Sequence, residues 1–140
     1  MPNCLILAGP NGAGKTTAAR LLLPALGMLD FVNADQLAVG LSAFRPESVA
    51  VAAGRLMLGR VRELATQGTD FAFETTLATR VFAPMIRQWR RNGYDVRLLY
   101  FYLPTATLPA AGSSAGGGWW SFYSTRRNTP ALLPVITLLL

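Results

Sequence analysis

Residues 4–17 read CLILAGPNGAGKTT, and this stretch decides the fold. The first five residues form a continuous apolar run, which is typical of a strand buried on both faces of a parallel sheet. A glycine-rich loop follows the run, and the apolar spacing over residues 15–26 predicts a helix. Strand, glycine loop and helix in this order form a unit that can bind phosphate groups.

The loop matches the pattern G-x-x-x-x-G-K-[ST] and continues into a second threonine. Glycines let the backbone fold around an anion, so that successive N–H groups point inward. Lys15, the only lysine in the chain, would reach the β- and γ-phosphates, and the Thr16 hydroxyl would ligate Mg²⁺. The alternative is a chance match in a glycine-rich turn. We predict an ATP site made by Gly9, Pro10, Asn11, Gly12, Ala13, Gly14, Lys15, Thr16 and Thr17.

The chain continues with strands that alternate with helices. Further strands are predicted at residues 31–33, 71–73 and 95–103, and further helices at 46–68 and 84–93. This order predicts the α/β fold class, a P-loop NTPase-type parallel sheet flanked by helices. The pattern stops near Pro104, so we expect a P-loop kinase-like core over residues 1–104 that is incomplete at its C-terminus.

Composition narrows the possible chemistry. The chain has 140 residues, enough for one domain, with 51% hydrophobic residues and a net charge of +6 that suits anionic partners. It has no histidine, which removes the commonest general base, and its single cysteine excludes an internal disulfide. No apolar run reaches the roughly 18 residues of a membrane span, and the N-terminus lacks a basic signal-peptide region. We therefore expect a cytoplasmic protein without a membrane partner.

Two acidic residues follow predicted strands. Asp35 comes just after residues 31–33, and Glu74 just after residues 71–73. In a parallel sheet the carboxyl ends of the strands face the same crevice as the phosphate loop. One carboxylate could take a proton from an acceptor hydroxyl while the other holds the acceptor. Alternatively, Asp35 is a helix N-cap and Glu74 is a solvated residue at a strand end.

Several ordered blocks between residues 2 and 104, namely GPNGAGKTT, FVNAD, AGRLML and FAFETTL, resemble the zeta-toxin family of P-loop kinases. The resemblance implies an ATP-dependent kinase, a possible antitoxin protein as partner, and a small-molecule hydroxyl acceptor. The characterised toxins phosphorylate the sugar of UDP-N-acetylglucosamine, so a UDP-amino-sugar is the acceptor that the resemblance implies. Carried over by position, Lys15 and Asp35 would be catalytic, Asp35 being the base. Asn33, Glu74 and Thr75 would bind the acceptor.

Residues 105–140 do not read like the rest of the chain. All seven acidic residues precede them, and the arginine-rich lid block of the resembling kinases is missing. Trp119 and Trp120 have only TGG codons, and a shifted frame turns them into the Gly-Gly of that block. We therefore expect a truncated or frameshifted kinase whose tail is out-of-frame or disordered and whose activity is lost. The alternative is a genuine glycine-rich linker with an aromatic segment.

Two other functions remain open. Arg87, Arg90, Arg91 and Arg97, together with the WWSFY segment, would suit a nucleic-acid-associated P-loop ATPase. Arginines on a helix more often form a solvated face, so nucleic acid is the weaker alternative. The third possibility is a degenerate remnant that binds ATP without catalysis.

Overall fold

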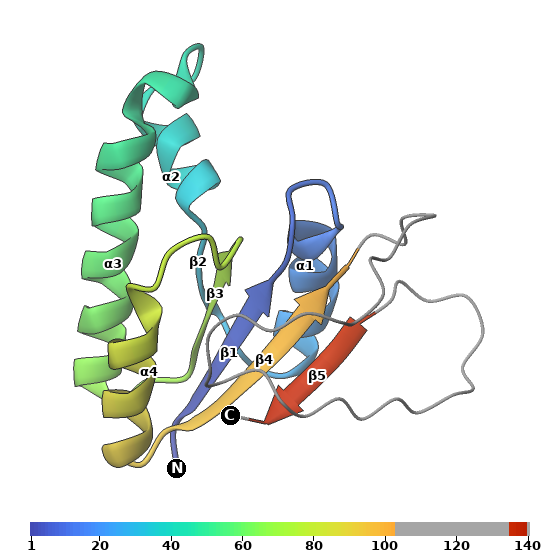
Figure 1. The fold of residues 1–140 in the computed structure, drawn as a ribbon, viewed down its shortest axis with the longest axis vertical. Coiled ribbons are helices and arrows are strands. Elements are labelled where there is room, and N and C mark those ends of the chain that lie inside the picture. Colours follow the sequence, from blue (N-terminus) through green and yellow to red (C-terminus); the bar gives the residue numbers. More distant parts are fainter. Residues whose placement is uncertain (103–134, 140) are drawn as a thin grey trace, which may run out of the picture.

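The computed structural model describes residues 1–102 and 135–139. These residues form one five-stranded sheet in the order β2-β3-β1-β4-β5 (Figure 1). The strands are β1 (Asn3–Ala8), β2 (Asp30–Val32), β3 (Phe71–Thr75), β4 (Asp95–Phe101) and β5 (Val135–Leu139). The first four are mutually parallel, and β5 pairs with β4 in the antiparallel direction. The predicted parallel α/β sheet is therefore confirmed.

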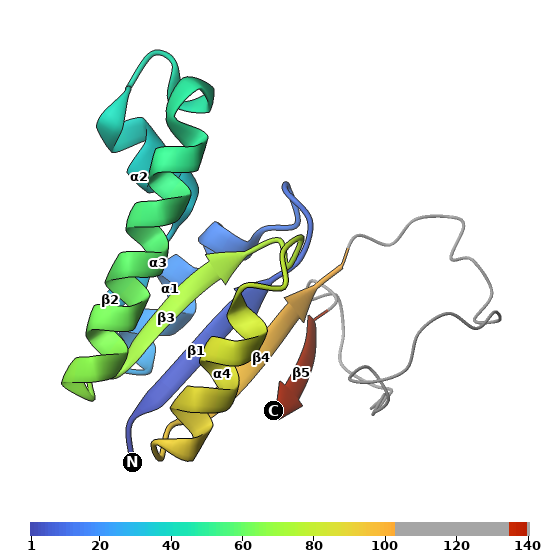
Figure 2. The same cartoon turned by 60° about the vertical axis from the view of Figure 1, so that its left-hand side comes forward.

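Helices cover both faces of the sheet (Figure 2). They are α1 (Lys15–Ala25), α2 (Ala34–Leu41), α3 (Ala50–Gln67) and α4 (Phe82–Arg91), with a 3-10 turn, η1 (Pro46–Val49), before α3. Alternate residues of β1 serve the two faces, as the period of two in a strand requires. Leu5 and Leu7 pack with α1, whereas Cys4 and Ile6 pack in the larger cluster with α3 and α4.

The helix predicted over residues 46–68 buries one apolar face in the structure. Ala53, Met57, Val61 and Leu64 are all buried, and they recur at the spacing that places side chains on one helix face. Gly68 ends the helix in the left-handed conformation, with φ of 69°, as expected of a glycine after the last turn. The predicted start at residue 46 is displaced, because η1 precedes the α-helix.

Two elements were not among the predicted strands and helices. A helix in the region of α2 was considered only as the alternative in which Asp35 is its N-cap. No strand period was found beyond Pro104, where β5 pairs Val135 with Phe101 and Leu139 with Arg97. β5 is a short run without polar alternation, so its sequence carries no strand-specific signal. The expectation that the tail is out-of-frame or disordered concerns residues that otherwise lie outside those described. Within the described part of the chain, no helix is long and apolar enough to cross a membrane.

Candidate active site

The phosphate loop joins β1 to α1 and depends on glycine geometry. Gly9, Gly12 and Gly14 have φ of 141°, 79° and 85°, a region that other residues rarely enter. The N–H of Gly9 donates to the carbonyl oxygen of Thr75 at 3.2 Å. A Cβ at Gly9 would lie 2.2 Å from the carbonyl oxygen of Phe101 in β4, which no side chain can tolerate. Only glycine lets the loop pass this close to the neighbouring strand.

The loop delivers the N-terminus of α1 to the site without a competing cap. Gly14 is the N-cap residue, it makes no side-chain cap hydrogen bond, and the first turn holds no acidic residue. The first N–H groups of the helix therefore point outward with the positive end of its dipole, which suits an anion. The Lys15 ammonium is 3% exposed and donates to the carbonyl oxygens of Gly9 at 2.9 Å and Pro10 at 2.8 Å.

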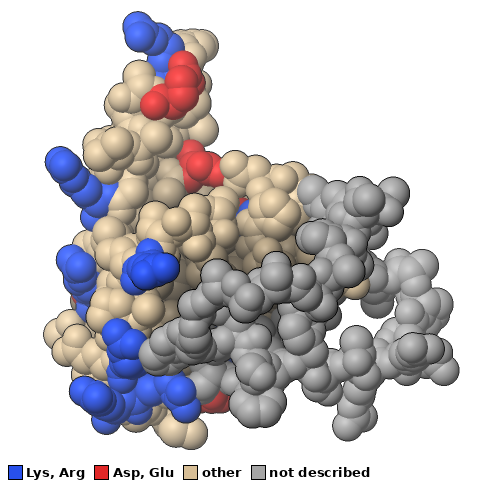
Figure 3. Space-filling model, viewed as in Figure 1, with Lys and Arg blue, Asp and Glu red and all other residues tan. Residues whose placement is uncertain are grey.

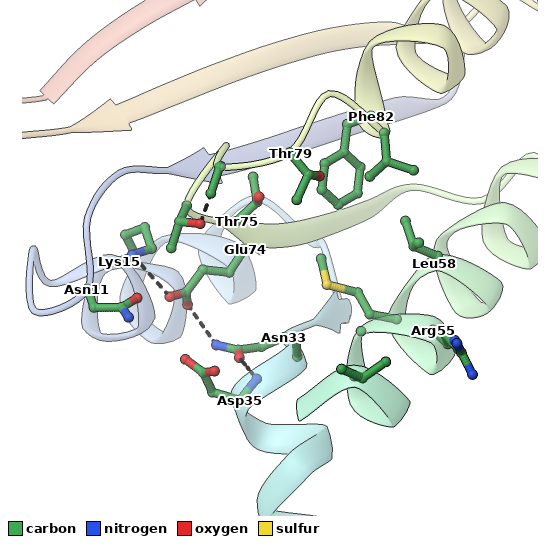
Figure 4. A pocket seen from close by; sticks show the side chains of 17 residues that line it. Asn11, Lys15, Asn33, Asp35, Arg55, Leu58, Glu74, Thr75, Thr79 and Phe82 are labelled. Atoms are coloured by element: carbon green, nitrogen blue, oxygen red, sulfur yellow. Dashed lines mark hydrogen bonds and ion pairs between the residues drawn. The ribbon is translucent and has the colours of Figure 1, made fainter. Parts of the chain in front are cut away.

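Glu74 at the end of β3 connects the phosphate loop to the neighbouring strand ends. Its Oε1 lies 3.5 Å from Lys15 Nζ, and its Oε2 accepts from Thr16 Oγ1 at 2.7 Å and from Asn33 Nδ2 at 2.8 Å (Figure 4). Its side chain is only 11% exposed. The alternative of a solvated Glu74 is therefore wrong, because three donors surround the carboxylate.

Asn33, not Asp35, caps α2. Its Oδ1 accepts from the N–H of Asp35 at 2.8 Å and of Gln36 at 3.3 Å, while its amide group donates to Glu74. The alternative of Asp35 as the N-cap is therefore wrong. Since the cap is supplied by Asn33, the exposed carboxylate of Asp35 remains available to the pocket.

A pocket of about 400 Å³ lies beside the phosphate loop. It lies between the loop, the start of α2, one side of α3 and the segment that leads from β3 to α4 (Figure 4). The lining residues come from all four: Asn11, Lys15, Asn33, Ala34, Asp35, Val51, Gly54, Arg55, Met57, Leu58, Glu74, Thr75, Thr76, Ala78, Thr79, Val81 and Phe82. The structure thus gathers Lys15, Asn33, Asp35, Glu74 and Thr75 around one cavity.

The AAA domain family AAA_33 matches residues 5–110 of the chain. The chain belongs to this family. No curated protein matches its sequence at a significant level.

Solved structures share the fold of this AAA domain. A candidate kinase from Chloroflexus aurantiacus matches with a TM-score of 0.58 and 13% identity, over 69% of this chain and 56% of that one. A structure of the PezAT toxin–antitoxin system of Streptococcus pneumoniae matches with a TM-score of 0.59 and 24% identity, over 70% of this chain and 45% of that one. A structure of the Pnkp1/Rnl/Hen1 complex matches with a TM-score of 0.55 and 20% identity, over 81% of this chain and 43% of that one. These TM-scores show a common P-loop kinase-like fold. The chain spans about half the length of the chains it matches.

The remaining predicted residues of this AAA domain lie around the same site. Thr75 Oγ1 accepts from the N–H of Leu77 at 3.0 Å, which orders the segment after β3. Ala13 is buried and closes the loop through its N–H, which donates to Pro10 at 3.3 Å. Thr17 is exposed on α1 and does not line the pocket.

The donor set fits a magnesium ion that is bound together with phosphate. Among the residues that the structure describes, no three His, Cys, Asp or Glu side chains gather into a metal cluster. Mg²⁺ in nucleotide sites is nonetheless held by one or two protein oxygens, water and the phosphates themselves. Thr16 donates its hydroxyl proton to Glu74 and accepts a long hydrogen bond from Asn33 Nδ2 at 3.4 Å, so a second lone pair of its oxygen remains available to a cation.

The basic surface of the AAA domain lies away from the phosphate loop. Arginine side chains gather over α3 and the lower part of α4 in Figure 3, and Arg90 and Arg91 occupy the last turn of α4. That turn precedes β4, so it lies at the amino ends of the strands, opposite the loop. A nucleic acid bound at the last turn of α4 would not reach the pocket directly, which counts against the nucleic-acid alternative.

Proposed function

We propose that the chain is built for ATP-dependent phosphoryl transfer to a hydroxyl group of a small molecule. One observation carries the proposal. Glu74 ties Lys15 and Thr16 of the phosphate loop to Asn33, and Asn33 places Asp35 on the same pocket. Phosphate-binding groups and an acidic residue that can accept a proton thus share one cavity, as phosphoryl transfer requires.

Lys15 would exchange partners when nucleotide binds. Its ammonium has three N–H donors, and the acceptors within reach are two loop carbonyls and Glu74. A β- or γ-phosphate oxygen would replace at least one of them, while the backbone N–H groups at the start of α1 hold the phosphate oxygens. Mg²⁺ bound with Thr16 would offset the charge of the phosphates.

Asp35 would serve as the general base. Its carboxylate would accept the proton of the acceptor hydroxyl as that oxygen bonds to the γ-phosphorus and the bond to ADP breaks. Asn33, Glu74 and Thr75 would position the acceptor through their polar groups at this end of the pocket. Apolar side chains of α3 and α4, such as Met57, Leu58 and Phe82, would exclude water from the other side.

The resemblance to zeta toxins and the fold shared with the PezAT structure support a UDP-amino-sugar, such as UDP-N-acetylglucosamine, as acceptor. They also support an antitoxin protein as partner. The present chain covers only about half the length of each matched solved chain. We propose a domain boundary near residue 104, after which the present sequence lacks the lid arginines that would contact the transferring phosphate.

Binding and turnover test the proposal separately. We expect the 140-residue chain to bind Mg·ATP and to release no phosphorylated sugar. A version whose reading frame is shifted by one base near codon 105 should transfer labelled γ-phosphate to UDP-N-acetylglucosamine. Arginine contacts to the transferring group are worth about a thousandfold or more in rate. Rapid phosphorylation by the 140-residue chain itself would contradict the proposed loss of activity.

A further inference from the structure

Two glycines in the interior of α3, Gly54 and Gly59, have no explanation in the fold. Glycine is among the least favourable residues in a helix interior, because it loses the most backbone freedom. Neither glycine has a positive φ, and a Cβ added at either would meet no heavy atom within 4 Å. Packing and backbone geometry would therefore accept a larger, more helix-favouring residue at both positions.

The two glycines face different cavities. Gly54 lines the pocket that holds Asp35 and Glu74, so a side chain there would project into the proposed acceptor space. Gly59 lines a neighbouring groove between β2, α2 and α3, which shares Asn33 and Arg55 with that pocket but contains neither carboxylate. The missing side chain at Gly54 thus enlarges the pocket at its α3 wall.

Arg55 follows Gly54 and borders the same pocket. It is exposed and makes no hydrogen bond or ion pair with another residue among those described. Arg60 on the same helix differs, since its guanidinium pairs with Asp30 and Glu63 at 3.0 Å each. An exposed guanidinium without a partner can bind a phosphate or carboxylate group of a ligand.

Charge is divided along the pocket. Figure 4 shows Asp35 and Glu74 beside the phosphate loop and Arg55 on the helix at the other end. Leu58 lies on the same helix as Arg55, and Phe82 lines the pocket from the start of α4. A ligand that fits this arrangement has a hydroxyl group at one end and an anionic group at the other.

We propose that Gly54 and Arg55 determine which acceptor the pocket takes. This inference rests on the proposed phosphotransferase function. The room at Gly54 receives the body of the acceptor against α3, and the Arg55 guanidinium binds an anionic group remote from the reacting hydroxyl.

The experiment measures acceptor binding with the phosphate loop already filled. The 140-residue chain is saturated with Mg·AMP-PNP, and equilibrium dialysis gives the affinities of labelled UDP-N-acetylglucosamine and of uncharged N-acetylglucosamine. Gly54→Met should weaken nucleotide-sugar binding by about tenfold or more, while the matched control Gly59→Met leaves it unchanged. Both changes should raise the thermal midpoint by a few degrees, because each replaces a helix-interior glycine. Arg55→Gln should lower the affinity for UDP-N-acetylglucosamine by about tenfold or more and leave the affinity for uncharged N-acetylglucosamine unchanged.

The outcomes separate this inference from the function on which it rests. If AMP-PNP fails to bind, or binds equally well to Lys15→Ala, the proposed function fails and the inference with it. If AMP-PNP binds normally and Gly54→Met leaves nucleotide-sugar affinity intact, only the inference is overturned. Equal losses in Gly54→Met and Gly59→Met, or no binding of the nucleotide sugar to the wild type, overturn it as well.

Discussion

Replacing Asn33 by alanine tests how the site is held together. The side chain is 5% exposed and does two things at once: its oxygen caps α2, and its amide donates to Glu74 at 2.8 Å. Asn33→Ala removes both interactions. Asn33→Ser keeps a capping oxygen and removes only the amide donor, so the pair of variants separates the two contributions.

The structure sets the expected size of each effect. Loss of an N-cap side chain costs about 1 kcal/mol. A hydrogen bond to a charged group contributes about 1.5–3 kcal/mol, and the lower value applies because Glu74 keeps Lys15 and Thr16 as partners. The free energy of unfolding should therefore fall by about 2–3 kcal/mol in Asn33→Ala and by about 1 kcal/mol less in Asn33→Ser. For a chain of 140 residues, the larger loss corresponds to a drop in Tm of about 7–10 °C.

Urea unfolding of the wild type and both variants measures these differences, with the slopes compared to verify two-state behaviour. The reasoning is refuted if Asn33→Ala is as stable as the wild type. It is refuted in part if serine and alanine are equally destabilising, because the capping role would then contribute nothing.

Three further predictions follow from other parts of the site and core. Gly9→Ala should abolish nucleotide binding and lower Tm, because its Cβ would strike the carbonyl oxygen of Phe101; unchanged Tm and ATP affinity in calorimetry would contradict the close approach. In the frame-shifted version, Asp35→Asn should reduce phosphoryl-transfer turnover by about two to four orders of magnitude with ATP affinity nearly intact; undiminished turnover in a labelled-ATP assay would remove Asp35 from the base role. Burial raises the pKa of the Cys4 thiol, so the folded state retains the proton that the unfolded chain releases, and the free energy of unfolding should fall as pH rises above about 8.5. That alkaline loss should be weaker in Cys4→Ala, and equal slopes in urea titrations at pH 8 to 10 would show that Cys4 does not cause it.

The sequence predicted the sheet well because its strongest signals are local. The apolar run before Gly9 predicts a buried strand, and the apolar spacing from Ala53 to Leu64 is typical of a helix with one buried face. The structure has both. The glycine loop carries its own geometric requirement, which the positive φ of Gly12 and Gly14 meets. Such features depend on neighbours in the chain, so a single sequence is enough to locate them.

The site was harder to predict because its contacts join distant elements. The sequence placed Glu74 at the same edge of the sheet as the phosphate loop, but it did not specify which loop residues the carboxylate contacts. In the structure β3 neighbours β1, and this strand order brings Glu74 to Thr16 across 58 positions. Asn33 was placed at the end of a strand, whereas it caps α2, a helix that the sequence suggested only with Asp35 as its cap. Strand order and cap identity follow from tertiary packing, which local patterns do not encode.

Gly54 shows a signal that was present and not used. A glycine in the middle of an otherwise regular apolar helix pattern marks either a close approach or a space that something else fills. The structure excludes a close approach at this position, since a Cβ there would meet nothing within 4 Å. The cavity beside Gly54 therefore favours the second possibility, a space that a ligand fills.

Nucleotide binding by the phosphate loop is the central claim, and equilibrium dialysis with labelled ATP and Mg²⁺ tests it most directly. The measurement compares the 140-residue chain with its Lys15→Ala variant, with circular dichroism to verify that both are folded. We predict saturable, Mg²⁺-dependent binding by the wild type and loss of most of that affinity in the variant, because Lys15 is the only ammonium group in the loop. Equal affinities for the two folded proteins, or no binding by the wild type, would contradict the account.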